Sequence, residues 1–239
     1  PLSELPPLSE LPPLSELPTY LEQGWTVYQQ IDYSASDIEV YQQDIVIHRT
    51  TGTAYNETAN GLETWHLYVG SLCREDYGDI RFTNSTGAEL AYYLWPDYDS
   101  SSARFCVRLT GADAAGSLFV WYGNSTAATT SNADETFLFF DDFAEDLSKY
   151  NTGSKSNGKT EIVNGQLKIY QNPSGAHWGA YAATKLEFNK TAPIQIQFQY
   201  SKPAGYDPNL RTIQTLYAVT DSPTASRDTQ YYYTPTSGQ

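Results

Sequence analysis

Short runs in which every second residue is apolar, separated by turn-forming residues, recur along this chain. Residues 77–94 give the clearest example. Ile80 and Phe82 alternate with polar residues, and the alternation resumes after the turn-forming segment 84–87. A period of two predicts strands and not helices, so we expect an all-β fold. We also expect a hairpin at 77–94, in which Gly87 takes the positive φ that closes the turn.

Several motifs follow one another in an order that is found in a known family. They are Gly-Asp-Ile-Arg-Phe-Thr at 78–83, Gly-x-Glu-Leu at 87–90, Phe-Val-Trp-Tyr-Gly-Asn at 119–124 and Phe-Phe-Asp-Asp-Phe at 139–143. Together they resemble the family called domain of unknown function 2341. The resemblance implies a β-rich module of archaeal and bacterial extracellular and surface proteins, often followed by a concanavalin A-like lectin/glucanase sandwich. It implies no reaction, because the family has no established chemistry.

The expected architecture is two β-sandwich domains, at 19–135 and 136–239, preceded by an extended tail at 1–18. Strands of the first sandwich are expected near 25–33, 38–40, 45–47, 65–69, 80–94, 105–109 and 118–122, with a polar loop at 51–61. The second should contain an opening strand at 137–143, a hairpin at 160–170 with Asn164-Gly165 at its tip, and strands at 178–182, 194–200 and 213–219. It is shorter than a complete sandwich of that type, so either it is truncated or a strand comes from elsewhere.

The tail consists of three copies of Pro-Leu-Ser-Glu-Leu-Pro. Its paired prolines favour a polyproline II-like conformation, because each proline removes an amide donor and forces its predecessor into extended geometry. Polyproline II has three residues per turn, so leucines spaced by three share one edge. A semi-rigid linker is the alternative, but a spacer has no reason to align its leucines. We expect this edge to bind the chain's own domains or, preferably, neighbouring copies; it consists of Leu2, Leu5, Leu8, Leu11, Leu14 and Leu17.

Acidic residues outnumber basic ones, with 28 Asp and Glu against 14 Lys and Arg, and the formal net charge is −14. This charge repels phosphate backbones and anionic lipid surfaces, so we expect no nucleic-acid partner. No apolar run is long enough for a membrane-spanning helix. Carboxylates suit an extracellular or cell-surface location and are calcium ligands. Asp141 and Asp142 are the candidates for calcium, with a helix or turn cap as the alternative, and we expect no other cofactor.

The two cysteines, Cys73 and Cys106, belong to no Cys-x-x-Cys motif. We therefore expect one disulfide in an exported protein, with two buried thiols as the alternative. Four Asn-x-Ser/Thr sequences indicate the same compartment as N-glycosylation acceptors. The family resemblance implies turns at two of them, at 84 and 124, so their asparagines are expected to be exposed. The four acceptors are Asn56, Asn84, Asn124 and Asn189.

Residue types that carry catalysis form no recognisable constellation in this sequence. A glucanase-type sandwich needs two carboxylates on one face of a strand, in a Glu-x-Asp-x-x-Glu run, and none occurs. The histidines His48, His66 and His177 are scattered without zinc-ligand spacing. No serine occupies a nucleophile elbow. We therefore predict that the protein is not an enzyme.

Two hypotheses about function remain. The leading one is a structural subunit of an extracellular filament, pilus-like appendage or cell-surface coat, in which the tail leucines bind other copies. The alternative is an adhesin that binds surface carbohydrates, with Trp178 and Tyr181 as the stacking residues, although tyrosines also favour strands and subunit interfaces. Serine at the leucines should abolish assembly under the first hypothesis. Alanine at Trp178 should abolish glycan binding under the second.

Overall fold

The computed structural model describes residues 18–33, 40–59, 62–110, 113, 116–154, 158–171, 180–186, 212–216 and 229–233. Within these ranges the chain is mostly β-sheet with short helical turns, so the predicted all-β sandwich class is confirmed. Contacts divide the chain into two compact units, Pro1–Leu186 and Glu187–Gln239. The ranges predicted for the tail and for the two sandwiches stay predictions.

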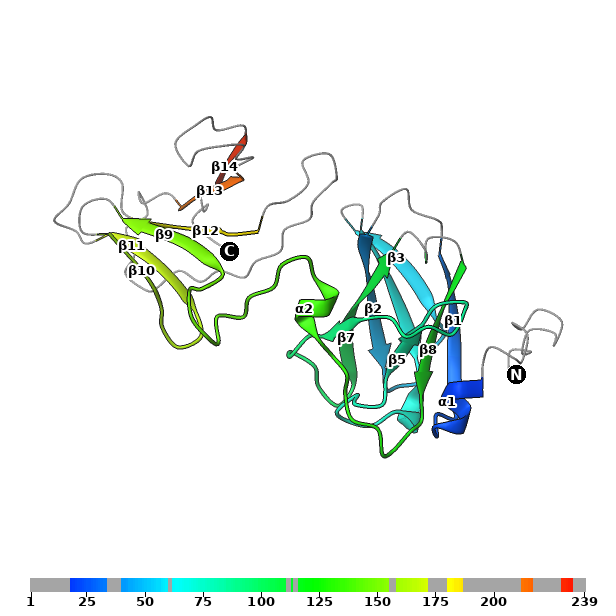
Figure 1. The fold of residues 1–239 in the computed structure, drawn as a ribbon. Coiled ribbons are helices and arrows are strands. Elements are labelled where there is room, and N and C mark those ends of the chain that lie inside the picture. The colour runs from blue at the N-terminus through cyan, green and yellow to red at the C-terminus, as the bar shows by residue number, and fades with distance from the viewer. Residues whose placement is uncertain are drawn as a thin grey trace. The chain divides into compact units, whose positions relative to one another are not determined.

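Two sheets in the first unit form a sandwich (Figure 1). The three-stranded sheet has the order β1-β8-β5 and the five-stranded sheet the order β3-β4-β2-β7-β6. Their strands pair antiparallel except β2 and β4, which run parallel. The strands are β1 (Val27–Tyr33), β2 (Val40–His48), β3 (Tyr55–Ala59), β4 (Leu62–Tyr68), β5 (Arg81–Thr83), β6 (Tyr92–Leu94), β7 (Ser102–Thr110) and β8 (Gly116–Tyr122).

Short helical turns and three strand pairs make up the remaining regular structure of the described chain. The helical turns are α1 (Pro18–Glu22), η1 (Gly70–Leu72) and α2 (Ala133–Thr136). After α2, β9 (Tyr150–Ser154) pairs with β12 (Ala180–Thr184), and β10 (Gly158–Ile162) pairs with β11 (Leu167–Gln171). In the second unit, β13 (Thr212–Leu216) pairs with β14 (Thr229–Tyr233).

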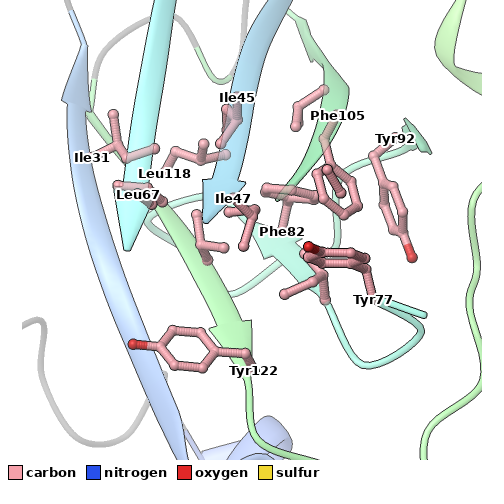
Figure 2. Packing of buried hydrophobic residues seen from close by; sticks show 14 of the residues in the cluster. Ile31, Ile45, Ile47, Leu67, Tyr77, Phe82, Tyr92, Phe105, Leu118 and Tyr122 are labelled. Atoms are coloured by element: carbon pink, nitrogen blue, oxygen red, sulfur yellow. The ribbon is translucent and has the colours of Figure 1, made fainter. Parts of the chain in front are cut away.

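The period-two alternation builds the core of the sandwich. Ile45 and Ile47 of β2 are fully buried in it (Figure 2). Their neighbours along the strand lie on the opposite face, because side chains alternate. Phe105 of β7 is in register with Ile45, so the apolar face continues across the sheet. Burying a side chain of this size stabilises the fold by about 1.5–3 kcal/mol before ordering costs. Other fully or nearly buried members are Ile31, Leu67, Val69, Tyr77, Ile80, Phe82, Tyr92, Val107, Leu109, Leu118, Val120 and Tyr122.

The segment 77–94 has the expected turn, but its two strands belong to different sheets. Gly87 has a φ of 81°, which confirms the prediction for the turn. The hairpin ends at an isolated bridge between Thr83 and Glu89. Beyond it β5 pairs with β8 in one sheet, whereas β6 pairs with β7 in the other. The hairpin prediction is therefore wrong beyond the turn, because this segment carries the chain from one layer of the sandwich to the other.

Asp79, in the motif before β5, is fully buried, and each of its carboxylate oxygens accepts a hydrogen bond. Its Oδ1 accepts the Arg74 N–H at 3.0 Å, and its Oδ2 accepts the Gly123 N–H at 2.8 Å. Its backbone carbonyl accepts the indole N–H of Trp25 at 2.6 Å. Most buried polar groups in folded proteins are paired in this way. One residue thereby connects the loop before β5 with the end of β8 and with the segment before β1.

Arg81 is also buried, with 5% of its surface exposed. Its guanidinium donates to the carbonyl oxygens of Gly78, at 3.1 Å, and Ala128. It lies 3.5 Å from the carboxylate of Glu89 and 5.2 Å from the centre of the Trp25 ring. Carbonyl oxygens, a carboxylate and an aromatic face together compensate the desolvation of this charge.

A second aromatic cluster covers the outer face of the three-stranded sheet. Tyr20 of α1 stacks on Trp121 of β8, with ring centres 5.2 Å apart. Its hydroxyl donates to Glu89 at 2.7 Å. The described chain therefore begins with a turn that is packed against the sandwich. The buried members of this cluster are Tyr20, Trp25, Phe119, Trp121 and Ala127.

The hairpin predicted at 160–170 is confirmed by the pairing of β10 with β11. Asn164 and Gly165 at its tip have φ values of 54° and 69°, as the predicted Asn-Gly turn requires. The strand predicted at 213–219 is present as β13, and the one at 178–182 as β12. The strand predicted at 194–200 lies outside the described residues.

Two other local predictions are wrong. Residues 55–59, predicted as part of a polar loop, form β3, an exposed edge strand that is held by backbone pairing with β4. Residues 137–143 form no strand. Instead, Phe137 and Phe140 pack on Tyr93 of β6, with ring centres 5.6 Å and 4.9 Å from it. Phe137 and Phe140 thus cover Tyr93 on β6, the edge strand of the five-stranded sheet.

Candidate functional site

Several predicted site residues lie outside the described part of the chain. Only the backbone is described for Tyr181, on β12. Predictions for these residues therefore stay predictions. The residues outside the described ranges are Leu2, Leu5, Leu8, Leu11, Leu14 and Leu17 of the tail, together with Trp178, His177 and Asn189.

Cys73 and Cys106 are free thiols, so the predicted disulfide is wrong. Cys73 packs in the core of the sandwich. Cys106 lies between Phe105 and Val107, which both face that core, so its own side chain is buried on the other face of the sheet. Two thiols on opposite faces of a sheet cannot bond. Burial raises the pKa of Cys73 to about 11 and also raises the pKa of Cys106, which keeps both protonated at neutral pH.

The three N-glycosylation sequences within the described residues differ in exposure. Asn56 on β3 is exposed. Asn84 is half-buried and donates to the carboxylate of Asp113 at 2.7 Å. Asn124 is only 6% exposed, and its amide donates to Gln23 O at 3.0 Å. The expectation that Asn124 is exposed is therefore wrong, because its side chain closes the contact between α1 and the end of β8.

Asp141 and Asp142 cap turns, which was the alternative to binding calcium. Oδ1 of Asp141 accepts the Phe143 N–H at 2.8 Å, and Oδ1 of Asp142 accepts the Ala144 N–H at 3.1 Å. Throughout the described ranges, no three His, Cys, Asp or Glu side chains gather in an arrangement that could hold a metal ion.

The structure brings together two histidines that the sequence pattern leaves apart. His48 is the last residue of β2 and His66 lies on the parallel neighbour β4, in register with Val46. Both side chains therefore lie on the outer face of the five-stranded sheet, close to each other. Nε2 of His48 is 2.9 Å from Nδ1 of His66. The spacing of the histidines along the chain gave no indication of this contact.

Two tyrosines complete the cluster. The imidazole centres are 5.2 Å apart and their planes meet at 17°, so the rings lie edge to edge in nearly one plane. Tyr68 stacks on His48 at 4.6 Å, and Tyr55 stacks on His66 at 4.5 Å. Gly52 leaves room for Tyr68, because a Cβ there would lie 2.4 Å from the phenol ring. We call Tyr55, His66, His48 and Tyr68 the histidine–tyrosine row.

Charged groups flank the histidine–tyrosine row on both sides. Glu57 of β3 places a carboxylate oxygen 3.4 Å from Nε2 of His66, a buried nitrogen that makes no hydrogen bond. On the other side, Arg104 of β7 pairs with Asp44 of β2 at 2.7 Å. The pKa of His48 is lowered, mainly because burial disfavours its charged form and also because a charge on His66 would repel it.

This geometry suits a shared proton better than a metal ion. The distance between the two nitrogens is that of an N–H···N hydrogen bond, in which one imidazole donates and the other accepts. A zinc ion would lie about 2.0–2.1 Å from each nitrogen, at a point on which both lone pairs converge. Here the nearly coplanar rings direct their facing nitrogens at each other.

The sequence carries only part of the signal for this site. The alternation of Ile45 with Ile47 predicts that His48 lies on the outer face of the sheet, and the alternation of Trp65 with Leu67 does the same for His66. The parallel pairing of β2 with β4 has no local signature, and β3 lacks an apolar alternation. The pairing of the histidines could therefore not be read from the sequence.

Among the described residues, no helix has the length and apolar character needed to cross a membrane. No curated protein and no solved structure matches the chain. The concanavalin-like sandwich implied for the C-terminal part thus has no support from these comparisons. A family match covers β5 to β9, less than half of the chain, and includes the buried Asp79 and Arg81. Residues 76–154 match the model of the family described as Domain of unknown function (DUF2341).

Proposed function

We propose that this protein is a structural subunit of an extracellular filament or cell-surface assembly, in which the N-terminal repeat binds neighbouring copies. The observation that carries the proposal is the anchoring of the chain directly after the repeat. A repeat that joins subunits must be attached firmly to the folded domain at its end. A repeat that only separates two domains does not need such an attachment.

The contacts of Tyr20 provide this attachment. The ring is 8% exposed and lies between Trp25, at 5.1 Å edge to face, and Trp121, at 5.2 Å in a stack. The Tyr20 carbonyl accepts the Trp25 N–H at 3.0 Å. The Tyr20 hydroxyl donates to Glu89, whose carboxylate also lies beside Arg81. Aromatic burial, a backbone hydrogen bond and a charged network thus hold one short segment on the sandwich.

The repeat offers an apolar edge that suits contact between copies. In polyproline II its six leucines align, as the spacing of three requires. Burying each leucine would contribute about 1.5–3 kcal/mol before ordering costs. The rigid conformation of a proline-rich segment reduces those ordering costs. The exposed Asn56 and the net charge of −14 are compatible with an extracellular location.

A carbohydrate-binding role gains no specific observation from the described residues. Trp25 and Trp121 are buried, and Trp65 packs against the core. Trp95 lies between Tyr93, at 5.3 Å, and the guanidinium of Arg104, at 5.0 Å. None of these four indoles offers the open face on which a sugar stacks.

Sedimentation velocity of purified protein tests the proposal. The test variant replaces all six leucines of the repeat with serine. The matched control replaces Ser3, Ser9 and Ser15 with alanine, which changes the same segment and leaves the leucine edge intact. Wild type and control should form large species whose fraction rises with concentration, and the leucine variant should remain monomeric. Equal assembly of the leucine variant, or monomeric wild type at every concentration, would overturn the proposal.

A further inference from the structure

We propose that His48 and His66 form an acid-sensitive latch that holds the β3–β4 hairpin on the sandwich and releases it when both imidazoles become charged. This inference rests on the histidine–tyrosine row and does not depend on the assembly proposed above.

The contact between His48 and His66 lies where the β3–β4 hairpin joins the rest of the sheet. β4 pairs with β2 on one side, from Asp44↔Thr64 to His48↔Tyr68, and with β3 on the other. Within the described strands β3 pairs with β4 alone, at the end of the five-stranded order. The hairpin is therefore joined to the sheet through the β2–β4 ladder, and the two histidines bridge that ladder on its outer face.

Counting protons shows why a second charge breaks the contact. When both imidazoles are neutral, one facing nitrogen carries a hydrogen and donates to the other. One added proton binds at a nitrogen away from the contact, and the N–H···N bond survives with one positive charge. A second added proton must bind at the accepting nitrogen. Two N–H groups of like charge would then face each other at a distance of 2.9 Å, so the rings must separate.

The surroundings accommodate one positive charge but not two. Glu57 of β3 faces His66 with its carboxylate and can compensate one charge. Arg104 and Asp44, from β7 and β2, pair with each other at 2.7 Å. Ser102 of β7, in register with His48, is uncharged. The tyrosines of the row, Tyr55 and Tyr68, are neutral in acid. The described residues around the row therefore supply one counter-charge for two histidines.

The direction of the pH effect follows from the lowered pKa of His48. In the unfolded chain this histidine takes up its proton near the ordinary value of about 6.5. In the folded chain it takes up the proton only at lower pH, so the unfolded state binds more protons in that interval. The contribution of His48 to folding stability is therefore fully present at pH values above its ordinary pKa. It declines as the pH falls below that pKa.

Amide hydrogen exchange on the full-length protein tests the latch, from about pH 8 to about pH 5, the range in which histidines titrate. Rates are corrected for the intrinsic pH dependence of exchange. If the release of the β3–β4 hairpin takes up one proton, its amides in the wild-type protein should lose protection by about tenfold for each pH unit of acidification. The amides of β7 and β8 should keep their protection. His66→Gln keeps a hydrogen-bonding side chain that cannot become charged, so it should weaken the pH dependence; the burial of His48 leaves a smaller part of it. His177→Gln is the matched control and should behave as wild type.

Two outcomes would overturn the latch. One is equal acid sensitivity of wild type and His66→Gln. The other is a loss of protection spread evenly over the sandwich. If His66→Gln does not fold at about pH 8, NMR titration of the wild-type imidazoles decides the question. The latch requires the backbone amide signals of β3 and β4 to change while the imidazoles take up protons. Unchanged β3 and β4 signals over the whole titration would refute it.

Discussion

Replacing Asp79 with alanine should destabilise the first sandwich by about 3–5 kcal/mol, because two partly buried hydrogen bonds to a charged acceptor are lost. Each such bond contributes about 1.5–3 kcal/mol, and the backbone N–H groups of Arg74 and Gly123 are left without an acceptor. Both donors are partly exposed, so water compensates part of the loss. This keeps the total below the full sum of the two bonds.

Urea unfolding at pH 7, followed by tryptophan fluorescence, measures this loss. Trp25 donates to the carbonyl of Asp79, so its emission reports on the same region. With a slope of about 1–3 kcal/mol per molar urea, the midpoint should fall by at least about 1 M.

Asp76→Ala in the same loop is the matched control for Asp79→Ala. The side chain of Asp76 is 52% exposed and pairs with Arg74 at the surface, at 2.6 Å. Exposed pairs of this kind are worth at most about 1 kcal/mol. A loss below about 1 kcal/mol for Asp79→Ala, or equal losses for both variants, would refute the view that Asp79 joins three segments of the fold.

The free thiols and the buried sequon give two further predictions. Thiol titration of the denatured, unreduced protein should detect two free thiols, Cys73 and Cys106, and reductant should leave the Tm unchanged. If no free thiol is detected, the placement of the cysteines on opposite faces of the sheet is wrong. In a host that N-glycosylates, mass spectrometry should find glycan on the exposed Asn56 and none on Asn124, because the Asn124 amide is bonded to Gln23 O; equal occupancy of both would contradict its burial.

The sequence predicted the strands of the first sandwich other than β3, because their apolar side chains alternate and face one core. Turn chemistry was equally informative: Gly87 closes the turn before β6, and Asn164-Gly165 forms the tip of the β10–β11 hairpin. These features are local, so one segment is enough to specify them. The change of sheet after Gly87 is a long-range feature, since β6 pairs with the distant strand β7 and not with β5.

The candidate site could not be predicted in the same way. Tyr55 lies on β3, a strand held by backbone pairing and without apolar alternation. His48 and His66 meet because β2 and β4 are parallel neighbours, and no short motif encodes that pairing. The predicted disulfide failed for a related reason, because spacing alone does not show that Cys73 and Cys106 lie on opposite faces of a sheet.

Electron microscopy of the full chain and of a chain lacking residues 1–17, at equal concentration, examines the proposed assembly without reference to individual side chains. The shortened chain keeps α1 and with it Tyr20, so its sandwich should fold as before. Filaments or ordered arrays that form only with the repeat are the predicted result. Single particles in both samples, or equal assembly in both, would contradict the role of the N-terminal repeat.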